Sequence, residues 1–86
     1  MQTKRQPAGT KKVAKRTDLE PIEFHVVPNG RRWDIERNDT FTGSFAYDVN
    51  VAVGVAIADA QRDRHNGLTA SVCVQQPNGS CRHVWP

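Results

Sequence analysis

The sequence lacks any apolar run long enough to cross a membrane, which takes about 18 consecutive apolar residues. Only 37% of its 86 residues are hydrophobic. The segment Asp18-Leu19-Glu20-Pro21 stands where a signal peptide would carry its apolar core. We therefore expect a cytoplasmic protein without a membrane partner, and the length allows one domain with a small core.

Cysteine is scarce, with only Cys73 and Cys81 in the chain. A cytoplasmic location favours two reduced thiols, and the alternative is a disulfide across the hairpin that holds both residues. Together with His65 and His83 they could suggest a zinc site, but the spacing Cys-x7-Cys-x-His lacks the close cysteine pair of structural zinc sites. We predict neither a metal nor a cofactor.

Acidic residues are absent from the first sixteen positions, which hold half of the basic residues: Lys4, Arg5, Lys11, Lys12, Lys15 and Arg16. From Thr17 onward, six arginines face nine acidic residues, so a segment of +6 joins a body of −3. Residues 1–20 also offer little apolar surface to bury. We expect a disordered basic tail over 1–20 and a single domain over 21–86.

The stretch from Phe24 to Ile35 predicts a β-hairpin. Asn29-Gly30 suits the two central positions of a type I′ turn. That turn would place Val26 opposite Trp33, Phe24 opposite Ile35 and His25 opposite Asp34. One face of the hairpin is then apolar and awaits a cover.

The rest of the chain predicts one helix among further strands. Residues 40–45 alternate as a short strand with a possible bulge at Gly43. Asp48 is a good N-cap for a helix over 49–65, which Asn66-Gly67 would end. Alternation over 68–75 and the turn at 77–79 predict a second hairpin. The fold class is α+β: an antiparallel sheet of four to five strands, β-β-(β)-α-β-β, packed on one helix.

The predicted helix carries two apolar stripes. The first, assigned to the sheet, consists of Val49, Ala52, Val53, Ala56, Ile57 and Ala60. Val51, Val55 and Ala58 form the second, which a single sheet cannot cover unless the strands curl around it. We predict a homodimer in which two helices pack around Gly54, with an interface of Val51, Gly54, Val55, Ala58 and Arg62.

The opening Phe24-His25-Val26-Val27-Pro28 and the pair Trp33-x-Ile35 resemble a family of small bacterial and phage-associated domains of unknown function, which open with aromatic-His-Val-Val-Pro. The capped, alanine-containing helix and the late Asn78-Gly79 turn add to the resemblance, which covers about residues 23–85. The resemblance implies a fold and no catalytic residues.

No catalytic site can be assembled from the sequence. His25 opposite Asp34 has no nucleophile or metal beside it, and we interpret the two as a structural cross-strand pair. The string from Arg62 to Asn66 is similar to a His-Asn-His nuclease motif but has one histidine, and a basic last turn favours the helix dipole. We predict a protein that is not an enzyme.

The basic tail predicts a nucleic-acid-associated module. Lysine and arginine clusters neutralise phosphates without reading sequence, and Arg31 and Arg32 at the hairpin tip could add contacts. The tail has no interleaved aromatics for stacking, and the partner could be DNA or RNA. The alternative is a protein-interaction module, such as a phage or mobile-element effector that docks on and inhibits a host nucleoprotein complex.

Overall fold

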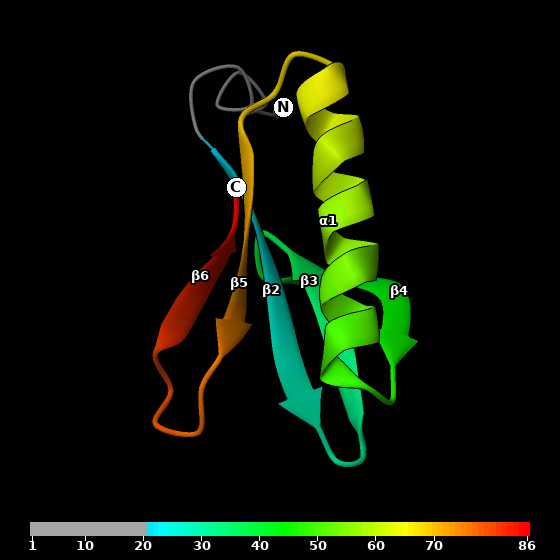
Figure 1. The fold of residues 1–86 in the computed structure, drawn as a ribbon, viewed down its shortest axis with the longest axis vertical. Helices are drawn as coiled ribbons and strands as arrows, with labels where there is room; N and C mark the ends of the chain where they lie inside the picture. The colour runs from blue at the N-terminus through cyan, green and yellow to red at the C-terminus, as the bar shows by residue number, and fades with distance from the viewer. Residues whose placement is uncertain (1–20) are drawn as a thin grey trace, which may run out of the picture.

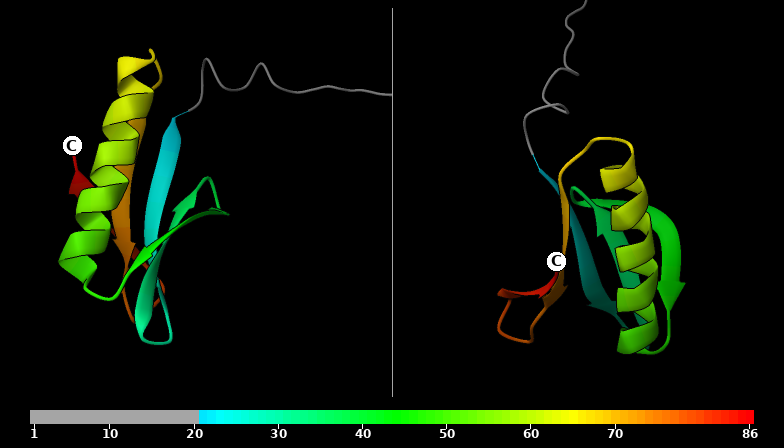
Figure 2. Two further views of the ribbon diagram at one scale, coloured as in Figure 1. Left: turned by 90° about the vertical axis from the view of Figure 1, so that its right-hand side faces the viewer. Right: turned by 45° about the horizontal axis from the view of Figure 1, so that its top comes forward.

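Five strands and one helix make up residues 21–86, the part of the chain that the computed structural model describes (Figure 1). A meander of β2 (Ile22–Asn29), β3 (Arg32–Arg37) and β4 (Thr40–Ala46) leads into α1 (Val49–His65), which is followed by β5 (Ala70–Gln75) and β6 (Cys81–Trp85). The helix lies against one face of the sheet (Figure 2). The predicted α+β class is confirmed, and the predicted tail over 1–20 lies outside the described residues.

The sheet is mixed, which corrects the prediction of an antiparallel one. Its strand order is β4-β3-β2-β5-β6, and all neighbours are antiparallel except β2 and β5. The two turns of the meander each reverse the chain, and α1 then runs antiparallel to β4. The chain reverses once more after the helix, so β5 runs in the same direction as β2 and β4. Because β5 joins the free edge of β2, that pair is necessarily parallel.

The first hairpin uses a different turn from the predicted one. Gly30 and Arg31 are its two central residues, and of these only Gly30 has a positive φ, of 65°. A glycine at the first central position is typical of a type II′ turn. The register moves by two residues, so Val26 lies opposite Ile35, and His25 lies opposite Glu36 instead of Asp34.

The type I′ conformation occurs at the next turn along the chain. Asn38 and Asp39 both have positive φ, of 50° and 70°, between the paired residues Arg37 and Thr40. The Asn38 side chain also accepts a 2.9 Å hydrogen bond from the Glu23 backbone N–H. Asparagine and aspartate tolerate this left-handed geometry better than most residues, which explains why the type I′ turn forms at Asn38-Asp39.

Gly43 lies in a bulge of β4, as predicted. The pairing with β3 shifts between Asp34 and Glu36, so that residues 42–44 together oppose Ile35. Gly43 has φ of +93°, and the Thr42 hydroxyl donates to the Ile35 carbonyl at 2.9 Å. The bulge adds two residues, which keeps Phe41 and Phe45 on the same face of the sheet.

The helix begins and ends where the sequence predicts. The Asp48 carboxylate accepts hydrogen bonds from the backbone N–H groups of Asn50 and Val51, at 2.8 and 3.2 Å. At the other end Gly67 has φ of +90°. Within residues 21–86, no helix has the length and hydrophobicity that crossing a bilayer would take.

The core lies between α1 and the sheet. Three alanines of the helix, Ala52, Ala56 and Ala60, are fully buried and let the helix approach the strands closely. The sheet contributes the aliphatic and aromatic side chains of every second position: Ile22, Phe24, Val26, Ile35, Ala70, Val72 and Val74. The predicted and the observed register of the first hairpin differ by two residues. Because the side-chain period of a strand is two, both registers point the same residues toward the helix.

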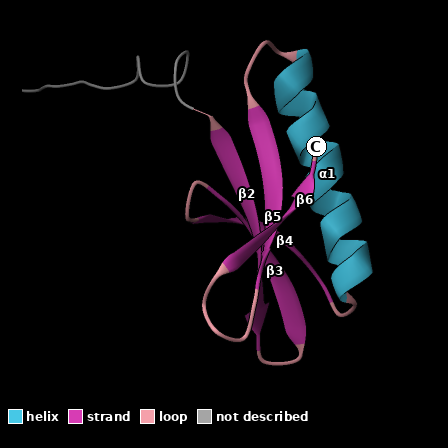
Figure 3. Cartoon of the chain, turned by 60° about the vertical axis from the view of Figure 1, so that its left-hand side comes forward, coloured by secondary structure: helices cyan, strands magenta, loops and turns pink. Residues whose placement is uncertain are grey.

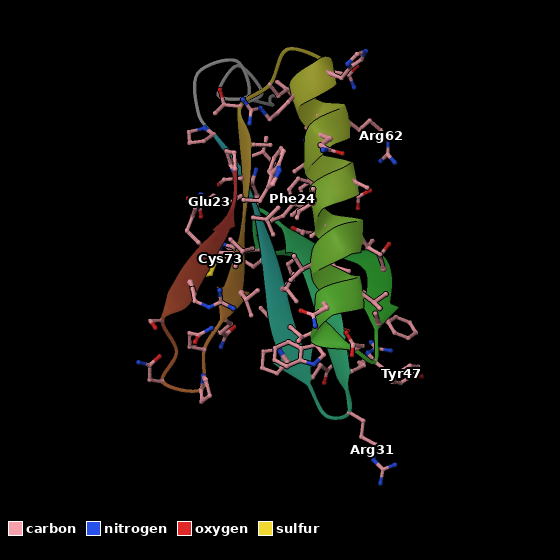
Figure 4. The ribbon with its side chains drawn as sticks, in the orientation of Figure 1. Glu23, Phe24, Arg31, Tyr47, Arg62 and Cys73 are labelled. Atoms are coloured by element: carbon pink, nitrogen blue, oxygen red, sulfur yellow. A yellow bond between two sulfur atoms is a disulfide. The ribbon has the colours of Figure 1, made fainter. Side chains whose placement is uncertain are left out.

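The two cysteines form a disulfide, which corrects the expectation of reduced thiols. Cys73 on β5 and Cys81 on β6 are bonded with their Cα atoms 5.6 Å apart, and the sulfurs are visible beside the Cys73 label in Figure 4. The second hairpin sets this pairing. His83 lies directly opposite Cys73, and Cys81 is the diagonal neighbour of Cys73 on the same face of the sheet.

Candidate binding surface on the open face of the sheet

The face of the sheet that points away from α1 has no covering layer within residues 21–86 (Figure 3). The alternation of the strands places polar and aromatic side chains on it. These include His25 on β2, Arg32, Asp34 and Glu36 on β3, Phe41 and Phe45 on β4, and Cys73 on β5. This open face therefore holds most of the chemically distinctive side chains of the described chain.

An aromatic cluster occupies the β3–β4 end of the open face and consists of Phe41, Phe45, Tyr47 and the guanidinium of Arg32. The Arg32 Cζ lies 4.2 Å from the ring centroid of Phe45 and 5.7 Å from that of Phe41. Tyr47 meets Phe45 edge to face, with centroids 5.8 Å apart. The three rings are 44%, 40% and 73% exposed, which is unusual for side chains of this size.

Asp34 holds Arg32 in this position. It is the one buried charged residue of the described chain, although it lies on the open face. Its Oδ2 accepts a 2.8 Å hydrogen bond from the Asn29 amide, and its Oδ1 lies 2.7 Å from Arg32 Nε. That second contact is not aligned as a hydrogen bond, so Oδ1 is satisfied by charge alone. The ion pair fixes the guanidinium above Phe45.

Of the predicted phosphate-binding residues, the structure describes Arg31 and Arg32, which have different surroundings. Arg31 projects from the tip of the β2–β3 turn, at the same end of the molecule as Tyr47 (Figure 4). Arg32 is half-buried and belongs to the aromatic cluster. The six basic residues Lys4, Arg5, Lys11, Lys12, Lys15 and Arg16 lie outside the described residues, and the described chain begins at the opposite end of β2 from Arg31.

The second stripe of the helix is only partly shielded by the chain. Val51 is 56% exposed, and Gly54 and Ala58 are also exposed, whereas Val55 is half-buried against the core. Arg62, the last predicted interface residue, donates to Asp59 on the same helix at 3.1 Å. The stripe thus exposes one large apolar side chain, Val51, which is close in sequence to Tyr47.

A second cluster lies at the β2–β5–β6 end of the open face. His25 Nε2 is 3.2 Å from the Glu23 carboxylate, and Nδ1 is 3.6 Å from that of Asp39. On its other side, the parallel pairing places His25 opposite Cys73. The sequence suggested His65 and His83 as companions of the cysteines. The antiparallel pairing does place His83 opposite Cys73, the parallel pairing adds His25, and His65 lies apart at the end of the helix.

The nuclease-like string is distributed among separate structural contacts. Arg62 bonds Asp59, Asp63 accepts a 3.0 Å hydrogen bond from Arg37 on β3, and Arg64 lies 5.3 Å from the Trp85 ring. His65 is exposed at the end of the helix. The contacts of Asp63 and Arg64 tie the last turns of α1 to β3 and β6.

The aromatic cluster was not predicted from the sequence. The alternation of residues 40–45 predicts that Phe41 and Phe45 share one side of a strand. Arg32 belongs to the separately predicted first hairpin, and nothing in the sequence indicates that this strand and the hairpin are neighbours. The signal was the even spacing of Phe41, Phe45 and Tyr47, which the bulge at Gly43 preserves.

Comparisons with protein-family models, curated proteins and solved structures return no match to this chain.

Proposed function

We propose that this protein is a non-enzymatic nucleic-acid-associated module that stacks unpaired bases on its aromatic cluster. The observation that carries this proposal is the group of exposed rings beside Arg32 on an uncovered sheet face. Proteins that bind single strands combine aromatic stacking platforms with nearby cationic groups. Phe41 and Tyr47 offer free ring surface for bases, and Arg31 stands at the same end to meet a phosphate.

The basic segment of the sequence supplies the second part of the proposal. Its six cations would contact phosphates without sequence preference, with an affinity that falls as salt rises. The body itself has few unpaired cations, because Arg32, Arg37 and Arg62 are each held by a carboxylate. Affinity would therefore come mainly from the segment, and preference for single strands from the aromatic cluster.

Fluorescence anisotropy with labelled oligonucleotides tests both parts. Single strands of DNA and RNA should bind more tightly than the matched duplex. Tyr47→Ala should lose about 1–3 kcal/mol of binding for each stacked base, and Tyr47→Phe, which keeps the ring, should bind as the unaltered protein does. Changing the six basic residues to glutamine should reduce the salt slope by about 0.7 for each phosphate that is no longer neutralised.

Two results would remove base stacking on the aromatic cluster from the proposal. One is equal affinity for single strands and duplex together with an unchanged Tyr47→Ala variant. The other is Phe41→Leu binding as well as the unaltered protein, because leucine keeps the apolar contact but has no face on which a base can stack. Absence of any binding at low salt would remove both parts at once.

A second candidate function is protein interaction through the helix, favoured by the exposure of Val51 and Ala58. In the simplest form, two copies pack their α1 stripes around Gly54 as an isologous dimer. Gly54 has no heavy atom within 4 Å of the position where a Cβ would stand, so the described chain leaves room beside it. An acidic body that docks on a host nucleoprotein complex belongs to the same class of function.

The mass in solution tests this candidate. A dimer should become a monomer in Val51→Asp, whereas Gln61→Glu, an exposed change on the same helix, should leave the mass unaltered. A monomer at high concentration would remove the dimer and leave the aromatic cluster as the binding surface.

A cytoplasmic location stays a prediction, and the Cys73–Cys81 disulfide weighs against it because such bonds persist mainly in oxidising compartments.

A further inference from the structure

The second cluster of the open face brings together three side chains that bind soft metal ions. His25, Cys73 and Cys81 come from the neighbouring strands β2, β5 and β6 and point to the same face. One nitrogen of His25 and the two sulfurs all lie within 4.8 Å of one another. They line a depression of about 290 Å³ that Glu23, Ser71 and His83 also border.

These distances suit a tetrahedral zinc site after a small rearrangement. Zinc binds cysteine sulfur at about 2.3 Å and histidine nitrogen at about 2.0–2.1 Å. Tetrahedral angles then place neighbouring ligand atoms about 3.3–3.8 Å apart. The sulfurs must separate and the imidazole must approach. Side-chain rotation can supply both movements, because Cys81 is exposed and Cys73 and His25 are half-buried.

The surroundings of His25 match those of a metal-binding histidine. Such residues nearly always use one ring nitrogen for the metal and direct the other toward a carboxylate or carbonyl. Glu23 and Asp39 each place a carboxylate near one of the two ring nitrogens. Whichever nitrogen binds the ion, a carboxylate is in place to orient the ring through the other.

We propose that Cys73, Cys81 and His25 form a zinc site in the reduced protein, and that the disulfide closes this site when the protein is oxidised. A thiol or phosphine reductant gives two electrons to the Cys73–Cys81 bond, and each sulfur takes up one proton. Zinc then binds the two sulfurs as thiolates and releases both protons. The ring of His25 gives the third ligand, and water completes the tetrahedron.

The two states exclude each other, because a sulfur in a disulfide is not a thiolate and binds zinc poorly. In a reducing compartment the hairpin would be held by the metal, and in an oxidising one by the covalent bond. Either link joins β5 to β6, and only the metal also ties both strands to β2. The proposal is independent of nucleic-acid binding, which uses the other end of the open face.

Cobalt titration of the full chain tests the site directly. The protein is reduced with a water-soluble phosphine, which becomes the phosphine oxide with oxygen from water, and is then separated from it without air. Adding Co²⁺ should give the thiolate-to-cobalt charge-transfer band and tetrahedral visible bands, saturating at one ion per chain. Zinc should bleach both. The oxidised protein should show neither, and equal spectra in the two states would overturn the proposal.

Three variants identify the ligands. His25→Gln and Cys81→Ser should each weaken binding at least tenfold, and Cys81→Ser should also reduce the charge-transfer intensity. His65→Ala, at the exposed end of the helix, is the matched control and should bind cobalt normally. Circular dichroism accompanies each titration. If the reduced protein unfolds and zinc does not restore it, or if His25→Gln binds cobalt normally, the site does not exist.

Discussion

The two faces of the sheet differ in what determines them. The face under α1 is apolar at its centre, where valine, isoleucine, phenylalanine and alanine side chains of interchangeable kinds fill one core. The open face carries an ion pair, three exposed aromatics and a disulfide, each dependent on particular neighbours. Burial therefore governs the covered face, whereas the strand register governs the open one.

The largest contrast is expected from deleting a phenylalanine on each face. Phe24→Ala should reduce the free energy of unfolding by about 3–5 kcal/mol, since Phe24 is almost completely buried in the small core. Phe41→Ala removes the same atoms from an exposed position and should change it by no more than about 0.5 kcal/mol. Urea denaturation followed by circular dichroism measures both.

Similar losses from the two phenylalanine variants would contradict the contrast, since they would mean that Phe41 is also buried in solution. Should Phe24→Ala fail to fold, Ile35→Val gives a milder test. Its expected cost is about 0.5–1.5 kcal/mol.

The helix offers the next contrast, between two alanines only two positions apart. Ala56→Leu should destabilise by about 1–3 kcal/mol, because Ala56 is fully buried against the sheet and larger side chains overpack a closed core. Ala58→Leu enlarges an exposed position and should stay within about 0.5 kcal/mol. Thermal unfolding of both variants measures this difference, and a costly Ala58→Leu would place that position in an interface.

The buried carboxylate of the open face should have an intermediate effect. Asp34→Ala removes the partner of both Arg32 and Asn29 and should cost about 1–2 kcal/mol. Asp34→Asn keeps the hydrogen bond but loses the charge, so a smaller cost is expected. Chemical denaturation gives the energies, and NMR shifts of the Phe45 ring would report whether Arg32 leaves it. If the NMR shifts of the Phe45 ring are unchanged in Asp34→Ala, Asp34 does not position Arg32.

The same contrast explains which features the sequence could predict. Alternating hydrophobicity identifies the buried residues without any knowledge of strand pairing, so Phe24 and Val26 are assigned correctly even though the predicted first turn is wrong. The helix bounds followed from local signals at Asp48 and Gly67. Each of these features depends on residues close together in the chain.

The open face could not be predicted because it depends on which strands are neighbours. The parallel pairing of β2 with β5 joins segments almost fifty residues apart, and only this pairing brings His25 to Cys73. The two-residue shift in the first hairpin likewise moves His25 from Asp34 to Glu36. Local patterns carry no information on either choice, and the cysteine pairing cannot be decided from the sequence for the same reason.

The first turn gives the smallest expected effect. In the predicted turn Asn29 would need a positive φ, which a β-branched residue rarely adopts. In the structure Asn29 ends a strand opposite Arg32, so Asn29→Thr should cost only the hydrogen bond to Asp34, about 0.5–1.5 kcal/mol. Gly30→Thr, at φ of +65°, is the control and should cost more. If denaturation shows that Asn29→Thr is as costly as Gly30→Thr, Asn29 also has a positive φ, so the predicted register holds in solution and the contacts of the open face must be reassigned. The core would be the same in either register, because a shift by two leaves every side chain on its own face.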